Sequence, residues 1–401
     1  MWFILVLIGL ALVTVCGLYV RRRLTQALTH LGVRSRRIRI VRWLVVWLLF
    51  GFPVLVIVAV VLSRLMDRAT IPRFDGVTAS LALGIPFILS VLVVLQSIPW
   101  LLALDLASLV VGRRRGEASA ARLRAIGGLV VLGAFALYTP VRILVERGDV
   151  RMRHFEVGGG SAAERPLRIA FLADIQQDAF TDGDRARELY AAVNRTQPDL
   201  VLSGGDWINT GPDHIEAAAA AAGTLHSPLG TFSVRGDHEH FAYVDRDRSV
   251  GELEAAMKRH GVTMLANEVR WFQHGDKRIA VLFLDYNYIA RTDAAAIASL
   301  VAATSTADYS IVVTHQLDRH LADLLADQVD LVLAAHTHGG QVNPVVGVVH
   351  VPLARIETRF VDGRYKLGRR TDVIVTAGVG YSIVPIRYAA PGSIETIDVR
   401  P

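Results

Sequence analysis

Acidic and histidine side chains recur in the second half of this 401-residue sequence where short apolar runs end. The runs end in ADIQ, SGGDW, RGDHEH, VVTHQ and AAHTHGGQ, in that order. Carboxylates have two oxygens that can bridge cations, and imidazoles suit Zn, Fe, Mn or Ni. We call these five stretches corners and interpret them as parts of one metal site. The candidate residues are Asp174, Gln176, Asp206, Asp237, His238, His315, His336 and His338.

The apolar runs alternate with amphipathic stretches, which predicts an α/β domain with a largely buried sheet. Predicted strands cover 167–173, 199–203, 231–235, 278–284, 309–313, 330–334 and 372–376. Predicted helices cover 184–196, 213–222, 250–260, 293–303 and 317–326. In such folds the loops after the strands carry the ligands, so the five corners should meet at one edge.

A lone aspartate or histidine in a loop is more often a solvated residue or a helix cap than a ligand. Five such corners in succession favour a metal site over that interpretation. Two cations about 3.5–4 Å apart can hold both the attacking and the leaving oxygen of phosphoryl transfer. Glycines beside the corners, among them Gly204, Gly205 and Gly236, let the backbone turn sharply and approach the ions.

The ordered corners resemble the calcineurin-like metallophosphoesterase family over residues 165–401. The AHTHGGQVNP corner and the tail GVGYSIVPIRYAAPGSIETIDV (378–399) resemble its membrane-anchored bacterial branch. The resemblance implies a β-sandwich flanked by helices around a di-metal centre, with metal-bound hydroxide as nucleophile. It implies Asp206 as the bridge, Asp174 and His338 on the first metal, and Asp237, His315 and His336 on the second. His238 would stabilise the transition state or protonate the leaving group.

Three positions depart from the family pattern. Gln176 stands where the family usually has histidine, Asp237 where it usually has asparagine, and Ala335 where it usually has glycine. A glutamine oxygen ligates hard cations such as Mn, Mg or Ca better than Zn or Fe. We expect two divalent ions drawn from Mn, Mg, Fe and Zn, with Mn favoured and Gln176 as a ligand. Asp178 is close enough in sequence to contribute.

Several neighbouring residues keep two interpretations at this point. Glu239 and His240 follow His238 and could line the pocket or lie in a solvated loop. His350 could be a pocket edge or a strand residue. We expect Trp207 to pack in the core rather than stack on a substrate. Arg387 is expected to support the fold near the site rather than to act in catalysis.

The first 150 residues differ in composition from the rest. They hold 18 Arg and 6 acids, whereas the remaining 251 residues hold 25 bases and 31 acids. Four segments are apolar over about the length that crosses a bilayer, 2–20, 43–62, 81–104 and 126–145. We predict a transmembrane region over 1–150 and the metallophosphoesterase domain over 165–401. Residues 146–166 are either a linker or a strand entering the sheet followed by a loop.

Arginine-rich loops predict the orientation of this region. The stretch 21–42 carries eight Arg and the stretch 111–124 carries five, and positive loops stay cytoplasmic. We therefore expect a multi-pass protein of the cytoplasmic (inner) membrane with its catalytic domain extracytoplasmic.

The leading hypothesis is a membrane-anchored, metal-dependent phosphoesterase that hydrolyses phosphomono- or phosphodiesters. Its location makes a lipid-linked phosphoester an attractive substrate, and the mildly acidic second part argues against nucleic acid as partner. Two alternatives remain. The domain could be a degenerate phosphoesterase that binds metal or phosphate as a sensor or scaffold, as Gln176 would suit. A transporter with a regulatory head is weaker, because Asp105 and Glu146 are the only acids at the ends of the spans.

Overall fold

The computed structural model describes the chain except residues 1, 66–76, 162–164, 348 and 383, and the side chains of 2–7, 60 and 63–65. The chain divides into two compact units. One comprises Met1–Arg147 together with Asn343–Val351, and the other comprises Gly148–Val342 together with Pro352–Pro401.

The first unit is helical. Its long helices are α1 (Trp2–His30), α2 (Ser35–Leu65), α4 (Ile85–Arg115) and α5 (Glu117–Glu146). A short α3 (Val77–Ala79) and one π-helical turn over Ser80–Gly84 lead into α4. The unit also contains a small antiparallel hairpin of β10 (Val345–Val346) and β11 (Val349–His350).

Three helical stretches among the described residues are long and apolar enough to cross a membrane, not the four predicted. They are Ser35–Ala59, Val77–Arg115 and Glu117–Glu146. The predicted span over 2–20 is not among them. The side chains of residues 2–7 lie outside the described part, and the described remainder of α1 runs directly into Arg21–Arg23.

Polar side chains join helices within this unit. The Tyr19 hydroxyl of α1 donates a hydrogen bond of 2.6 Å to Asp105 of α4. The buried Arg23 of α1 forms an ion pair with the same carboxylate at 3.4 Å. Its guanidinium also donates to the backbone oxygen of Arg124 in α5 at 3.2 Å. These contacts tie α1 to the two helices that follow, because a buried guanidinium needs partners.

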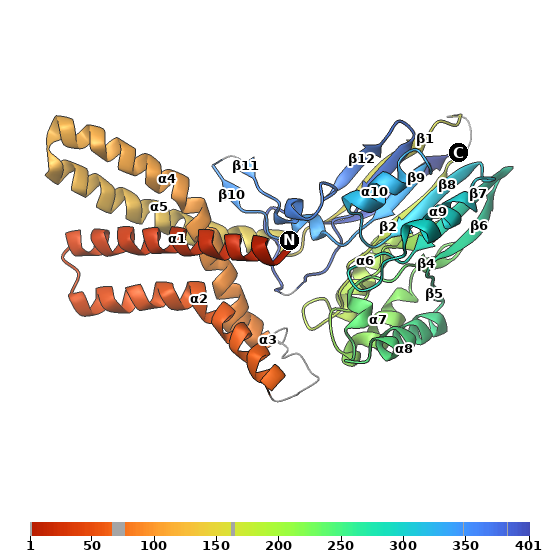
Figure 1. Ribbon diagram of the computed structural model, residues 1–401, viewed down its shortest axis with the longest axis horizontal. Coiled ribbons are helices and arrows are strands. Elements are labelled where there is room, and N and C mark those ends of the chain that lie inside the picture. The colour runs from red at the N-terminus through yellow and green to blue at the C-terminus, as the bar shows by residue number, and fades with distance from the viewer. Residues whose placement is uncertain (1, 66–76, 162–164, 348, 383) are drawn as a thin grey trace. The chain divides into compact units, whose positions relative to one another are not determined.

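The second unit contains two six-stranded sheets (Figure 1). The first has the order β1-β14-β2-β3-β4-β5 and the second the order β12-β13-β9-β8-β7-β6. Neighbours β2 to β5 are parallel, as are β7, β8, β9 and β13. The first sheet comprises β1 (Val150–Gly158), β2 (Leu167–Leu172), β3 (Leu200–Ser203), β4 (Thr231–Ser233), β5 (Val262–Met264) and β14 (Gly392–Arg400). The second comprises β6 (Glu268–His274), β7 (Lys277–Leu284), β8 (Tyr309–Thr314), β9 (Leu331–Ala334), β12 (Gly363–Leu367) and β13 (Thr371–Val375).

Alternating side chains make this unit a four-layer sandwich. Ile169 and Phe171 of β2 point into the core between the sheets, whereas Ala170 and Leu172 point into a core with the first helical layer. In β7, Val281 faces the other sheet, whereas Leu282 and Leu284 face the second helical layer. The helices are α6 (Gly183–Arg195), α7 (Ile215–Ala222) and α8 (Arg246–Arg259) beside the first sheet, and α9 (Ala294–Ala302) and α10 (Arg319–Leu325) beside the second (Figure 1). Because strand side chains alternate with period two, the central strands bury both faces, whereas the edge strands β1, β6 and β12 stay partly exposed.

All seven predicted strands and all five predicted helices are present, with shifts of a few residues at their ends. Residues 150–158, for which the sequence left a linker and a strand open, form β1, which pairs in parallel with β14 near the chain end. That pairing joins segments more than 240 residues apart, so local sequence could not establish it.

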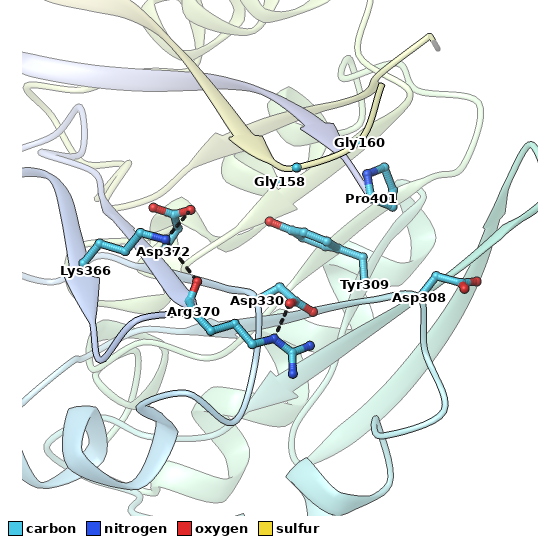
Figure 2. A pocket seen from close by; sticks show the side chains of 10 residues that line it. Gly158, Gly160, Asp308, Tyr309, Asp330, Lys366, Arg370, Asp372 and Pro401 are labelled. Atoms are coloured by element: carbon cyan, nitrogen blue, oxygen red, sulfur yellow. Dashed lines mark hydrogen bonds and ion pairs between the residues drawn. The ribbon is translucent and has the colours of Figure 1, made fainter. Parts of the chain in front are cut away.

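A polar cavity of 390 Å³ opens at the edge where strands β8, β9 and β13 begin (Figure 2). Tyr309, Asp330 and Arg370 line it, and Arg370 forms an ion pair with Asp330 at 2.6 Å. The predicted metal ligands follow the ends of these strands. The cavity therefore lies at the opposite edge of the sheet from the candidate metal site.

Candidate metal centre

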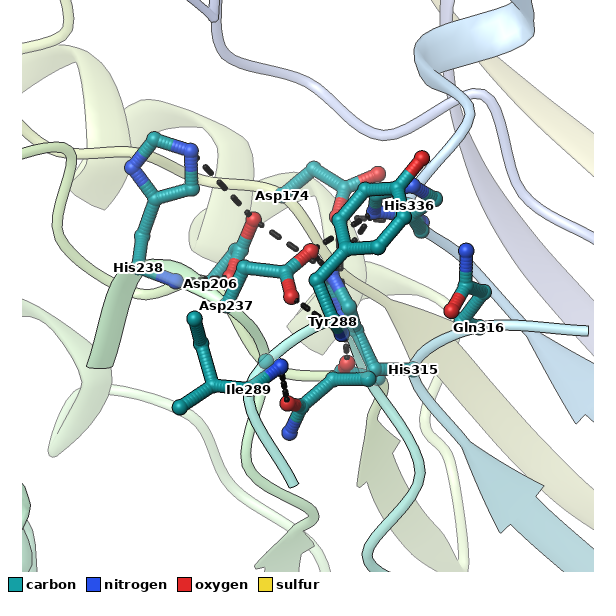
Figure 3. Close-up of polar contacts among 12 residues, drawn as sticks. Asp174, Asp206, Asp237, His238, Tyr288, Ile289, His315, Gln316 and His336 are labelled. Carbon is teal, nitrogen blue, oxygen red and sulfur yellow. Dashed lines mark hydrogen bonds and ion pairs between the residues drawn. The ribbon is translucent and has the colours of Figure 1, made fainter. Parts of the chain in front are cut away.

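The predicted ligands come together where the parallel strands of both sheets end. Asp174 follows β2, Asp206 follows β3, Asp237 follows β4, His315 follows β8 and His336 follows β9. Figure 3 shows their side chains converging from these loops. Two groups of potential metal ligands have donor atoms within 4.8 Å of one another. They are Asp174, Asp206 and His315, and Asp237, His315 and His336.

The backbone at this edge is strained. Left-handed φ values occur at residues with a Cβ, which is uncommon and favours a functional role where such residues cluster. Five of the candidate ligands have them: Asp174 (52°), Gln176 (45°), Asp206 (59°), His336 (75°) and His338 (51°). The strain is held by ordered loop hydrogen bonds, such as Gln176 N to the Asp206 carbonyl at 2.8 Å.

His315 lies at the centre of the site. Its Nδ1 donates to the Gly204 carbonyl at 2.7 Å, so Nε2 is the nitrogen through which the neutral imidazole can bind a cation. That Nε2 lies 3.5 Å from Asp206 and 3.3 Å from Asp237. The imidazole is fully buried, so its orientation is imposed by the surrounding loops.

His336 is held by a carboxylate at each ring nitrogen. Its Nδ1 lies 2.9 Å from Asp237, and its Nε2 lies 3.2 Å from Glu357. Gln316 donates a hydrogen bond to the same Glu357 oxygen. The Tyr288 ring stands against the His336 ring at a centroid distance of 4.8 Å. A metal at the Asp237–His315 side would use Nδ1 and leave Nε2–H for Glu357, the arrangement that orients metal-binding histidines in proteins.

Three of the predicted ligands have a buried polar atom without a hydrogen-bond partner. Asp174 Oδ2, Gln176 Oε1 and His338 Nδ1 have no hydrogen-bond partner within the described part of the chain. Buried polar atoms normally have a hydrogen-bond partner, so three unpartnered atoms among the predicted ligands need an explanation. Carboxylate and amide oxygens and an imidazole nitrogen are donors of the kind that ligate divalent cations, although His338 belongs to neither of the two ligand groups above. The residues present therefore fit the metals that the sequence predicted.

Gln176 makes one further contact that bears on this position. Its side-chain nitrogen donates to Asp206 Oδ2 at 3.2 Å, which orients its oxygen away from that carboxylate. The amide nitrogen thus occupies one acceptor position of Asp206 Oδ2, an oxygen of the carboxylate that is expected to bridge the two metals.

His238 lies beside the carboxylates. Its Nδ1 donates to the Asn209 carbonyl, and its Nε2 lies 4.0 Å from Asp206 Oδ2 (Figure 3). Its backbone N–H donates to the other Asp206 oxygen at 2.8 Å. The ring is partly exposed, so Nε2 is available to a ligand at the site.

Glu239, whose role the sequence left open, is fully buried and positions the site. Its carboxylate accepts hydrogen bonds from the backbone N–H groups of Asp206 at 2.9 Å, Trp207 at 2.7 Å and Gly236 at 2.5 Å. A Cβ at Gly236 would overlap the Asp206 carboxylate. Glu239 and Gly236 therefore hold Asp206 in place from two sides.

The site raises the proton affinity of its histidines. Burial lowers the pKa of His336, but hydrogen bonds to Asp237 and Glu357 outweigh it and raise the pKa to about 9. Burial also opposes the rise for His315, whose pKa the surrounding carboxylates still hold well above its ordinary value. Burial raises the pKa of the Asp174 carboxyl to about 6. The carboxylates thus attract positive charge, and protons compete with metal for these ligands.

His338 differs electrostatically from the other histidines. Burial, and then the positive charge of Arg387, hold its pKa well below its ordinary value. A neutral imidazole with an unpartnered nitrogen is the form that ligates metal.

Four further residues lie at or near the site. The sequence analysis missed Glu357, which follows no apolar run, and Tyr288, which follows β7 but is not a usual metal-ligand residue type. Asp178 accepts hydrogen bonds from the Thr181 backbone in its own turn and from the Asn209 side chain, so its part in metal binding stays a prediction. Buried Arg387 donates to backbone carbonyls, including that of His338 at 3.1 Å. It therefore supports the fold, as expected.

Residues 167–340 match the calcineurin-like phosphoesterase family. This domain belongs to that family. The match covers the strand ends that carry the metal-site residues from Asp174 to His338. The sequence-based recognition is therefore confirmed for the domain, and the sandwich with its candidate ligand clusters agrees with it.

Several curated relatives share this domain. An uncharacterized metallophosphoesterase of Campylobacter jejuni, Cj0846, is 27% identical over 280 residues, which cover 68% of each chain. The phosphodiesterase YaeI of Escherichia coli is 28% identical over 222 residues, 54% of this chain and 76% of that one. A transmembrane protein with metallophosphoesterase domain from Danio rerio is 25% identical over 58% of this chain and 53% of its own. The chain spans 61% of the length of two Helicobacter pylori relatives.

Proposed function

We propose that this protein is a membrane-tethered, metal-dependent phosphoesterase. The observation that carries the proposal is the pair of ligand groups that share His315, together with the unpartnered buried atoms Asp174 Oδ2, Gln176 Oε1 and His338 Nδ1. Two adjacent cation positions suit the transfer of a phosphoryl group to water. The relative named a phosphodiesterase supports the same reaction class.

Each residue has a proposed role. Asp174, Gln176, Asp206 and His338 would hold the first cation, and Asp206, Asp237, His315 and His336 the second. Bound cations would supply electrostatic stabilisation of the phosphoryl group and activation of water. His238 would hold a phosphoryl oxygen or donate a proton to the leaving group through Nε2, since its Nδ1 is engaged by Asn209. Gln176 and Asp237 make Mn or Mg the favoured ions.

The proposed location is the outer side of the cytoplasmic membrane. The stretches 21–42 and 111–124, each rich in arginine, flank the candidate spans in α2, α4 and α5. With both stretches cytoplasmic, the chain leaves α5 on the outer side whether or not α1 spans the membrane. The N-terminus alone depends on α1. A reporter fused after Pro401 tests this, because alkaline phosphatase is active only outside the cytoplasm.

A second candidate function rests on the Gln176 amide. Its nitrogen donates to Asp206 Oδ2, the oxygen that a bridging role would use. A domain that binds one cation or phosphate without turnover would act as a sensor or scaffold. This function predicts fewer than two metals per chain.

The test uses the full-length protein purified in detergent. Bound metals are counted by elemental analysis, and hydrolysis of an aryl phosphodiester is measured with Mn, Mg, Zn or chelator. We expect two metals per chain and turnover that Asp206→Asn abolishes. The matched control is Asp276→Asn, which changes an exposed aspartate in a turn. Fewer than two metals per chain with no turnover for any cation would favour the sensor or scaffold function.

A further inference from the structure

The polar cavity at the edge where β8, β9 and β13 begin lies wholly within the second unit (Figure 2). Its volume, 390 Å³, is in the range of cavities that hold small molecules. Its wall contains three aspartates, a lysine, an arginine and a tyrosine around the glycine run 158–160. None of these residues takes part in the metal centre, so the proposed function leaves the cavity unexplained.

Tyr309, the first residue of β8, gives the first indication of a ligand. Only 5% of its surface is exposed, and its ring packs in the core between the two sheets. Figure 2 shows its hydroxyl directed into the cavity, towards Lys366 and Asp372. The hydroxyl has no hydrogen-bond partner within the described part of the chain. A buried phenol usually has a partner, so its partner should come from the cavity.

The carboxylate of Asp330 already has partners at both oxygens. One oxygen accepts a hydrogen bond from Arg370 Nε at 2.6 Å. The other accepts hydrogen bonds from the backbone N–H of Ser310 at 2.9 Å and from the Ser310 hydroxyl at 2.8 Å. A ligand would have to displace one of these groups to bind Asp330.

The other two aspartates of the cavity also have partners. Asp372 Oδ1 accepts two hydrogen bonds from Arg364, at 3.0 and 3.1 Å, and Asp372 Oδ2 lies 3.3 Å from Lys366 Nζ. Asp308 is exposed and accepts a hydrogen bond from the backbone N–H of Arg278 at 2.7 Å. Among the described residues, the three aspartates do not form a group of close metal ligands. These contacts favour a ligand other than a cation.

The groups that remain unused are hydrogen-bond donors. Arg370 donates from its side chain through Nε, and both of its Nη groups lack an acceptor in the described part of the protein. Lys366 Nζ has three N–H groups, of which Asp372 and the Arg370 backbone oxygen, at 3.1 Å, engage two. The Tyr309 hydroxyl completes the set. These donors suit an oxyanion, because hydrogen bonds from charged donors to anionic oxygens are short and strong.

We propose that this cavity is a binding site for a small oxyanion, a phosphate or a carboxylate group, held by Tyr309, Lys366 and Arg370. The aspartates do not oppose an anion, because Arg364, Lys366 and Arg370 offset their negative charges. The site is separate from the metal centre, since the two lie at opposite edges of the sheet. The inference therefore does not depend on the proposed function.

The test variant is Tyr309→Phe, which removes only the hydroxyl. Tyr190→Phe is the matched control, because Tyr190 of α6 is buried in the core of the first helical layer, against Trp207. The full-length protein in detergent is titrated with phosphate or with acetate by isothermal titration calorimetry. Each titration is run with metals bound and again after chelation and desalting, because anion binding at the metal centre needs the metals and binding in the cavity does not.

We expect one anion per chain to bind the metal-free protein. Its affinity should fall about 10–100-fold in Tyr309→Phe and stay unchanged in Tyr190→Phe, as the loss of a hydrogen bond to a charged group predicts. Without anion, the melting temperature of Tyr309→Phe should equal or slightly exceed that of the unsubstituted protein, because the hydroxyl has no protein partner to lose. Tighter binding of phosphate would assign the site to phosphate groups, and tighter binding of acetate would assign it to carboxylates.

Three results would overturn the proposal. The first is the absence of anion binding to the metal-free protein. The second is an equal anion affinity of Tyr309→Phe and the unsubstituted protein, since the hydroxyl would then not contact the anion. The third is a lower melting temperature of Tyr309→Phe without anion, since the hydroxyl would then have its partner in the protein.

Discussion

Gln176→His tests the least usual residue of the metal centre. Gln176 is fully buried and donates to Asp206 at 3.2 Å, while its oxygen has no partner among the described residues. The substitution removes a hydrogen bond to a carboxylate, worth about 1.5–3 kcal/mol. In a domain of this size each kcal/mol shifts the melting temperature by about 2–4 °C. Without metal, the variant should therefore melt about 3–12 °C lower.

With metal the same substitution should act in the opposite direction. An imidazole is a better ligand for Zn and Fe than an amide oxygen, so Zn should stabilise the variant more than it stabilises the natural sequence. Each tenfold gain in Zn affinity adds about 1.4 kcal/mol to the free energy of unfolding at saturating metal. The gain for Mn should be smaller, which moves the metal preference towards Zn.

The assay is thermal unfolding of the full-length protein in detergent, followed by near-UV circular dichroism in chelator, in excess Mn and in excess Zn. Elemental analysis of the same samples counts the bound metal. Gln273→His is the matched control, because Gln273 is exposed on β6 and reports Zn binding by a surface histidine. An unchanged melting temperature in chelator together with an unchanged metal preference would refute the placement of Gln176 at the first metal.

Three further predictions follow from contacts around the site and the sheet. Glu357→Gln should weaken metal binding about 10–100-fold, measured by competition with a chelator, because it loses the carboxylate that orients a metal-site histidine. Gly236→Ala should release metal, because its Cβ overlaps the proposed bridging carboxylate, whereas Gly251→Ala in open space on α8 should stabilise by about 0.5–1 kcal/mol. The Arg168 hydrogen bond lowers the pKa of Asp398 below its ordinary 3.8, so this carboxylate stabilises the fold above that pH and loses its effect below it. In Asp398→Asn, the free energy of unfolding should therefore fall less steeply as the pH is lowered.

Each of these has an outcome that contradicts it. Unchanged metal affinity in Glu357→Gln would show that the carboxylate does not act through the imidazole. Normal metal content in Gly236→Ala would show that the loop relaxes around the new Cβ. If the free energy of unfolding of Asp398→Asn fell as steeply with acid as that of the unsubstituted protein, carboxylates other than Asp398 would cause the loss of stability.

Local sequence determined much of the domain. The alternation of Ile169, Ala170 and Phe171 predicts β2, because strand side chains alternate between faces with period two. The order of the corners after β2, β3, β4, β8 and β9 predicts the ligand set, because parallel strands end at one edge. These elements were identified correctly since their patterns are local and strong.

The membrane region shows what apolar length leaves open. The predicted spans 81–104 and 126–145 lie within the longer helical stretches Val77–Arg115 and Glu117–Glu146. A helix continues through charged residues as readily as through apolar ones. Apolar length therefore marks a candidate span more reliably than it marks where the helix and its membrane segment end.

Only the tertiary structure decided how distant segments meet. The pairing of β1 with β14 joins the two ends of the domain, and no local pattern encodes the partner of a strand. Glu357 reaches His336, and Glu239 holds Asp206, through contacts that depend on loop paths. The sequence by itself determined which residue types stand after which strands. Their distances, their unpartnered atoms and their supporting carboxylates follow from packing, because side chains far apart in sequence share one enclosed edge.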